Sequence, residues 1–241
     1  MERIDYIRRE EKKYHDLCYE QYKLFETGSW LYKPVKTVMD MMQYFEDQVQ
    51  VKVLDLGCGV GRNSILIAQK IIRGGGIITC VDLLDSALSN LIINSKKYHV
   101  SEAIEPIQAA IENFPIQPDN YDYIIAVSSL EHINSTEAVQ KALLSIKRGT
   151  KQNGINCFII NSNVQEFDME TNEERAVLIE VNLSTETMLD ILKSTYKGWK
   201  EIHMKVKELS YNITRNEKSI RLQTNVITFV VQKRGAYDES E

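Results

Sequence analysis

Apolar residues recur at spacings of three, four and seven between positions 4 and 25, which predicts an amphipathic helix over 4–25. The mixed charges at 8–13 favour a solvated helix face, with a docking site as the alternative. A second amphipathic segment, 35–45, leads into 51–56, where the apolar pattern is typical of a buried strand.

The chain then alternates between two kinds of pattern. Helical patterns cover 62–72, 82–98, 135–147 and 183–192, and strand patterns cover 77–81, 104–109, 121–127, 155–160, 199–209 and 219–231. Repeated strand, helix, strand units predict right-handed crossovers and a mostly parallel α/β sheet with helices on both faces. Only a predicted turn, 211–218, separates the last two strands, so we expect an antiparallel C-terminal hairpin. The polar stretch 161–181 is predicted to be a loop.

Composition narrows the class of protein. The 241 residues are 43% hydrophobic and 26% charged, as in ordinary globular proteins, and the net charge of −5 argues against a nucleic-acid-coating role. The four cysteines form no C-x-x-C pair, which disfavours a zinc ribbon and a disulfide scaffold. With no signal-peptide pattern and no apolar run near the roughly 18 residues of a membrane span, we expect a cytoplasmic protein without membrane or metal partners.

One motif, VLDLGCGVGRNS at 53–64, carries most of the chemical information. Closely spaced glycines such as Gly57 and Gly59, between a strand and a helix, let the backbone approach a ligand without side-chain obstruction. Arg62 stands where a dinucleotide-binding motif has its third glycine. The acid at Asp55 would repel a pyrophosphate but attract a cationic ammonium or sulfonium.

This motif resembles motif I of the class I S-adenosylmethionine-dependent methyltransferases, and a structural glycine turn in another α/β protein is the alternative. The segment 61–64 and the terminal hairpin are further similar to the tellurite-resistance methyltransferase branch. The resemblance implies S-adenosylmethionine as cofactor, S-adenosylhomocysteine as product, and a Rossmann-like, seven-stranded sheet. It also implies methylation of a small nucleophile by a monomer or weak homodimer.

Two positions after the second predicted strand extend the resemblance. Asp82 lies 21 residues beyond Gly61, where related folds place a carboxylate on ribose hydroxyls. A cap for the following helix is the less favoured alternative for Asp82, and both roles could coexist. Leu83 is expected either to pack on adenine or to be ordinary core.

The segment QAAIENFP at 108–115 resembles the family segment that meets adenine. The resemblance implies that the backbone of Ile111 contacts the ring. Ala110 replaces the usual first acid, so Glu112 or a backbone carbonyl would have to bind the adenine amino group. Glu112 as an exposed loop acid is the alternative.

Val127 and Ser128 end the fourth predicted strand and are expected beside the reacting methyl group, because ligands of such sheets bind beyond the carboxyl ends of strands. His132 and Glu131 follow as weak candidates for a general base, and a structural, hydrogen-bonded histidine is the alternative. In-line methyl transfer from a sulfonium needs alignment and desolvation, and a base only for a protonated acceptor.

The acceptor pocket is expected to be roofed by residues 28–33, with Trp30 and Lys33, and by the insertion after the fifth strand. Trp30 would close over the cofactor or serve in packing. Residues 163–190 carry eight acids and one base, which favours a neutral or cationic acceptor if they form a lid, or is simply a solvated surface.

We therefore predict methyl transfer to an unidentified small molecule. The alternatives are methylation of a protein or RNA, a non-catalytic S-adenosylmethionine-binding regulatory module, and an NAD-dependent oxidoreductase. The expected organisation is one domain, 1–241, comprising a helical cap (1–50), a cofactor-binding core (51–162) and a lid helix with the C-terminal hairpin (163–241).

Overall fold

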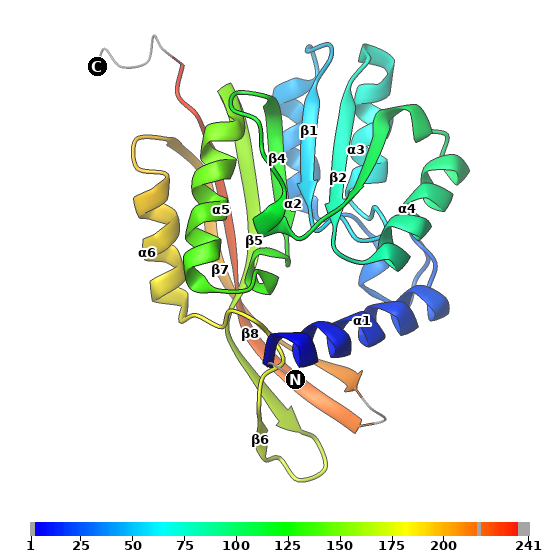
Figure 1. The fold of residues 1–241 in the computed structure, drawn as a ribbon, viewed down its shortest axis with the longest axis vertical. Helices are drawn as coiled ribbons and strands as arrows, with labels where there is room; N and C mark the ends of the chain where they lie inside the picture. Colours follow the sequence, from blue (N-terminus) through cyan, green and yellow to red (C-terminus); the bar gives the residue numbers. More distant parts are fainter. Residues whose placement is uncertain (1–2, 216–217, 236–241) are drawn as a thin grey trace.

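A single eight-stranded sheet organises the chain in the computed structural model, which describes residues 3–215 and 218–235 (Figure 1). Its strands are β1 (Lys52–Leu56), β2 (Ile77–Asp82), β3 (Ile104–Gln108), β4 (Tyr121–Val127), β5 (Thr150–Asp168), β6 (Glu174–Arg175), β7 (Lys200–Arg215) and β8 (Lys218–Gln232). The order is β3-β2-β1-β4-β5-β8-β7, with β6 paired to β5. Strands β1 to β5 are parallel, and β8 is antiparallel to both β5 and β7. The predicted mostly parallel sheet with an antiparallel hairpin is confirmed, and the short β6 adds an eighth strand.

Helices cover both faces of this sheet. They are α1 (Arg3–Gln21), α2 (Lys36–Asp40), α3 (Ser64–Ile71), α4 (Asp85–Lys97), α5 (Thr136–Gly149) and α6 (Thr185–Thr195). Successive residues of β1 face opposite sides, so Val53 joins the core under α3 and α4 while Leu54 joins the core under α5 and α6. Both sheet faces are therefore buried, as the continuous apolar strands predict.

Three expected boundaries were wrong. Strand β5 continues through 161–168, which was expected to be loop, because it keeps pairing with β8 beyond a bulge at Ser162. Strands β7 and β8 likewise extend through most of the predicted turn 211–218, with Tyr211 opposite Leu222. The predicted helix 35–45 is a five-residue α2 followed by a 3₁₀ helix.

The arrangement leaves α1 lying across the ends of the strands (Figure 1). Strand order reverses at β1, which has β2 on one side and β4 on the other. In open α/β sheets, the crevice beyond the carboxyl ends of the strands at this reversal is where ligands bind. Within the described ranges, no helix has the length and apolar character needed to cross a membrane.

Candidate active site

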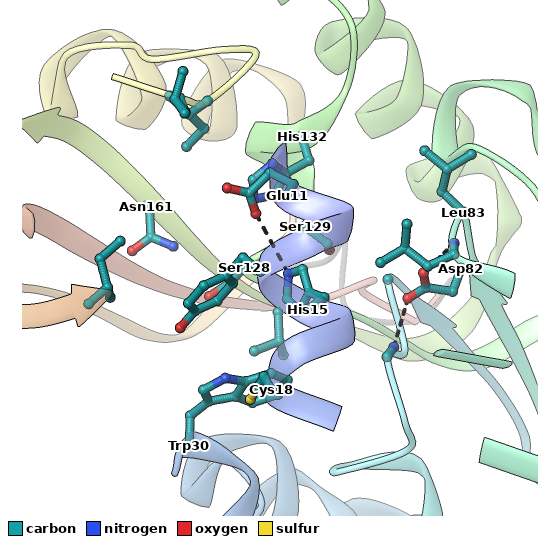
Figure 2. A pocket seen from close by; sticks show the side chains of 18 of the residues that line it. Glu11, His15, Cys18, Trp30, Asp82, Leu83, Ser128, Ser129, His132 and Asn161 are labelled. Atoms are coloured by element: carbon teal, nitrogen blue, oxygen red, sulfur yellow. Dashed lines mark hydrogen bonds and ion pairs between the residues drawn. The ribbon is translucent and has the colours of Figure 1, made fainter. Parts of the chain in front are cut away.

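A cavity of about 850 Å³ lies at this crevice, within the size range of small-molecule sites (Figure 2). Its walls come from the glycine loop after β1, the residues after β2 and β4, helix α1, segment 177–180 and the hairpin of β7 and β8. Ten of the residues expected at the site line it: Trp30, Gly57, Gly59, Asp82, Leu83, Ile111, Glu112, Val127, Ser128 and His132. Asp55, Lys33 and Glu131 are not among the lining residues.

The glycine loop is folded tightly against its neighbours. Gly57 and Gly59 have φ of +77° and +54°, a region that side-chain-bearing residues rarely adopt. A Cβ on Gly57 would fall 2.3 Å from the Cβ of Ser129. The amides of Gly57 and Cys58 both donate to the carbonyl of Val81, at 2.8 and 3.1 Å. The loop therefore presents bare backbone to the cavity.

Asp82 connects this loop to the next helix. One carboxylate oxygen accepts a hydrogen bond from the amide of Gly59 at 2.8 Å, and the other accepts one from the amide of Leu84 at 2.9 Å. Burial raises the pKa of Asp82, and these amide hydrogen bonds oppose the rise. Asp82 therefore makes a local turn before α4, and its two oxygens retain lone pairs that can accept further hydrogen bonds from a ligand.

Asp55 does not reach the cavity, which corrects the expected attraction of a cationic ligand by direct contact. Its side chain is buried and accepts a hydrogen bond from the Ser64 hydroxyl at 2.5 Å, at the start of α3. Burial raises its pKa to about 7, although the Ser64 hydrogen bond opposes the rise. Asp55 thus braces the loop from beneath.

The three residues expected near adenine, Leu83, Ile111 and Glu112, lie on the cavity wall. Leu83 is 42% exposed, so it belongs to the cavity surface and not to the core. Glu112 is not a free loop acid, because its carboxylate accepts a hydrogen bond from the guanidinium of Arg8 at 2.8 Å. Ile111 precedes it in a 3₁₀ turn.

Trp30 forms part of an aromatic wall. The guanidinium of Arg62 lies 5.1 Å from the centre of its ring and donates to its carbonyl oxygen at 3.0 Å. The Tyr19 ring meets it edge-on at 6.4 Å. Lys33 instead places its ammonium over the Tyr32 ring at 4.8 Å and does not line the cavity, which corrects its expected place beside the acceptor.

His132 lines the cavity (Figure 2). Its Nδ1 lies 2.9 Å from a carboxylate oxygen of Glu180. Burial lowers its pKa, but the Glu180 hydrogen bond and the charges of Glu11 and Glu131 outweigh this and raise the pKa to about 9. The ring is therefore protonated near neutral pH, whatever role it has.

Glu131, the second candidate base, is fully buried behind the cavity. One of its oxygens accepts hydrogen bonds from the backbone amide and side-chain amide of Asn161, at 3.0 and 2.6 Å. Burial raises its pKa. The expectation that Glu131 contacts an acceptor is therefore wrong. Glu131 instead connects the segment after β4 to Asn161 of β5.

Ser128 directly follows β4 and lines the cavity. It is one of the few non-glycine residues with a positive φ, +50°, and its amide donates to the carbonyl of Ile159 at 2.7 Å. Strained backbone of this kind persists where surrounding structure holds it, often at functional sites.

The sequence did not reveal the residues that line the rest of the cavity. They lie on α1, segment 177–180 and β7, and include Arg8, Glu11, Tyr14, Glu180, Tyr211 and Arg215. The charge run 8–13 was interpreted as solvated, yet Arg8 and Glu11 face the cavity. Arg215 donates two hydrogen bonds to the carboxylate of Glu166, at 2.9 and 2.7 Å. Only long-range contacts bring these charges together, so no local pattern could predict them.

Comparison with known proteins identifies the core of the chain. Residues 53–154 match the family model described as a methyltransferase domain. This segment is a methyltransferase domain. It holds the glycine loop, Asp82 and His132, and its class I assignment and S-adenosylmethionine cofactor agree with the resemblance of motif I.

Three similar proteins fit this domain assignment. A ubiquinone biosynthesis O-methyltransferase of Rickettsia conorii is 31% identical over 110 residues, which is 45% of this chain and 34% of that protein. TehB from Haemophilus influenzae has 21% identity and a TM-score of 0.64, with 91% of this chain and 67% of that chain covered. An S-adenosylmethionine-dependent methyltransferase from Methanosarcina mazei has 15% identity and a TM-score of 0.60, with 84% of this chain and 99% of that chain covered. The two structural likenesses show the fold, and the chain covers 34% to 39% of the curated relatives' lengths.

The residues of the methyltransferase domain fit its cofactor. Bare backbone at Gly57 and Gly59, a carboxylate with spare lone pairs at Asp82 and an exposed apolar side chain at Leu83 share one cavity. These groups match the needs of an amino-acid portion, ribose hydroxyls and adenine. Among the described residues, no three His, Cys, Asp or Glu side chains gather as metal ligands would.

Proposed function

We propose that the protein transfers a methyl group from S-adenosylmethionine to a small-molecule acceptor. The observation that carries this proposal is that one cavity is lined both by the glycine loop and by α1, segment 177–180 and β7. An acceptor beside the cofactor would be surrounded by these elements, and a folded protein or an RNA would need a more open surface. We also propose a cytoplasmic location and a monomer or weak homodimer.

The bound cofactor supplies an electrophilic methyl group on a positively charged sulfur. Asp82 would hold the ribose hydroxyls, and Val127 and Ser128 would orient the acceptor beside the cofactor. Helix α1 would exclude water from the nucleophilic atom of the acceptor. Asp55 acts on this reaction only by keeping the loop in place.

For an acceptor that carries a proton, we assign proton removal to His132. Its Nδ1 is occupied by Glu180, whereas its Nε2 has no hydrogen-bond partner among the described residues. Neutral His132 would take the proton at Nε2, and Glu180 would stabilise the imidazolium that forms. Because its pKa is raised to about 9, turnover of such an acceptor should rise with pH toward pH 9.

The charged residues on the acceptor side of the cavity, away from the glycine loop, support a neutral or cationic acceptor. Glu11, Glu166 and Glu180 line it, and the guanidinium groups of Arg8 and Arg215 already pair with carboxylates. On α1 and β7, an anionic acceptor would therefore find both cavity-lining guanidinium groups already paired, and the remaining one, Arg62, lies against Trp30. A neutral hydroxyl acceptor also agrees with the name of the Rickettsia conorii relative.

The test is a screen for S-adenosylhomocysteine release with hydroxyl- and amine-bearing metabolites. We expect turnover with a restricted group of small acceptors, and a large loss of turnover in Asp82→Asn. Tight binding of S-adenosylmethionine without transfer to any small acceptor, together with methylation of protein or RNA in a cell extract, would contradict the proposal. Binding without any transfer would favour a non-catalytic module.

A further inference from the structure

Four side chains of alternating charge, Glu112, Arg8, Glu180 and His132, contact one another in sequence along the cavity wall. The guanidinium of Arg8, on α1, donates to the carboxylate of Glu112 at 2.8 Å, and its Nε lies 3.6 Å from the carboxylate of Glu180. Glu180 in turn contacts Nδ1 of His132 at 2.9 Å. The side chains of Glu112 and Glu180 are 9% and 2% exposed, whereas those of Arg8 and His132 are 31% and 33% exposed, so each contact has one buried partner.

Helix α1 also holds the backbone that carries Glu180. Residues 176–184 form neither helix nor strand, so contacts with other elements fix their position. Arg3 donates hydrogen bonds to the carbonyl oxygens of Ile179 and Glu180, at 2.9 and 3.4 Å. Two arginines of one helix therefore contact Glu180: Arg3 donates a hydrogen bond to its carbonyl oxygen, and Arg8 lies at ion-pair distance from its carboxylate without a hydrogen bond.

We propose that Arg8 is a positioning residue that holds Glu180 against His132, so that the N-terminal helix completes the acceptor side of the site. The inference rests on the proposed function for its catalytic meaning, because Arg8 acts on the acceptor only through Glu180 and His132. Without Arg8, the carboxylate of Glu180 is free to turn away from the imidazole.

Two effects of removing Arg8 have opposite signs, which makes the proposal testable. The charged and titratable groups around His132 are Glu180, Glu11, His15, Glu131, Asp82 and Arg8. If Glu180 stayed in place, the loss of a nearby cation would raise the pKa of His132. If Glu180 moves away, His132 loses its main stabilising partner and its pKa falls.

The experiment is an NMR titration of the His132 ring, assigned by the signal missing in His132→Asn. We expect the pKa of His132 to fall by about one unit or more in both Arg8→Gln and Glu180→Gln. The matched control is Arg9→Gln, because Arg9 is on the same helix but lies against Tyr6 and does not line the cavity. It should leave the titration unchanged.

An unchanged or higher pKa in Arg8→Gln would overturn the proposal. If Arg8→Gln loses its native circular dichroism, Arg8→Met, which keeps the aliphatic stem, is titrated in its place with the same expectation. The titration needs neither cofactor nor acceptor, and calorimetry with S-adenosylmethionine is measured separately. Failure of cofactor binding would therefore reject the proposed function while leaving the role of Arg8 to be decided by the titration.

Discussion

Two aspartates near the glycine loop differ in their surroundings, and this decides what each does. Asp55 is sealed under the loop and binds the Ser64 hydroxyl, whereas Asp82 borders the cavity and binds two backbone amides. Both could be identified in the sequence, Asp55 as the acid before the glycine turn and Asp82 as the acid after the second predicted strand. The direction in which each side chain points depends on strand register and on packing, which local patterns do not contain.

Asp82→Asn should weaken S-adenosylmethionine binding by about 1 to 3 kcal/mol, because an amide replaces a carboxylate that accepts several hydrogen bonds at once. Isothermal calorimetry measures the change. Asp85→Asn is the matched control, since Asp85 is exposed, pairs with Lys12 and does not line the cavity. Equal affinity in Asp82→Asn and the unchanged protein would show that the ribose is held elsewhere.

His132 should make stability depend on pH. Its pKa is about 9 in the folded protein against an ordinary value of 6.5. A raised pKa stabilises the fold below about pH 6.5, and this contribution is lost as the pH rises through about 9. Because the side chain is 33% exposed, screening reduces the contribution to about 1 to 2 kcal/mol. Urea denaturation should show that the free energy of unfolding declines less with rising pH in His132→Asn than in the unchanged protein. An equal decline in both would mean that other groups cause the pH dependence.

At the scale of elements, the strands and helices from β1 to α5 were predictable because their apolar patterns are strong. The prediction of secondary structure failed where the buried positions of an element are polar. In the outer part of β5, every second residue is buried, yet these include Ser162, Glu166 and Asp168. Helix α1 shows the same difficulty, because Arg8 and Glu11 meet charged partners from distant segments.

The glycine loop gives the clearest prediction at this scale. Gly57→Ala should destabilise the protein by at least 2 kcal/mol, about twice the cost of backbone strain alone, and should weaken cofactor binding. Gly198→Ala is a matched control, because Gly198 also has a positive φ, +90°, but a Cβ there would meet no atom within 4 Å. Denaturation and calorimetry compare the two. Equal losses would mean that the contact with Ser129 relaxes freely.

At the scale of the whole molecule, the cavity is lined by residues inside and outside the segment that matches the methyltransferase family model. The methyltransferase domain match, 53–154, contains the proposed cofactor-binding residues, while Glu11, Glu180 and Arg215 lie outside it. The cofactor could therefore be predicted from a local motif, since the glycine loop, its strand and its helix are contiguous. The proposed acceptor region could not be predicted, because it is lined by segments more than 200 residues apart in the chain, such as those that carry Glu11 and Arg215.

We propose that these segments fold as one domain, and the two tryptophans can test this. Trp30 lies in the cavity wall, and Trp199 packs against the core under α5 and α6. In Trp30→Phe, the remaining Trp199 reports unfolding of the core under α5 and α6. In Trp199→Phe, the remaining Trp30 reports unfolding of the cavity wall. After correction for each variant's stability by circular dichroism, both should show a single transition that coincides with the loss of helix. Separate transitions would indicate independent units.

The most direct test of the account is a crystal structure with S-adenosylhomocysteine bound. We expect its ribose hydroxyls on the carboxylate of Asp82, its amino-acid portion beside Gly57 and Gly59, and its sulfur directed past Ser128 toward His132. Binding at any other surface, with the glycine loop making no contact to the ligand, would contradict it.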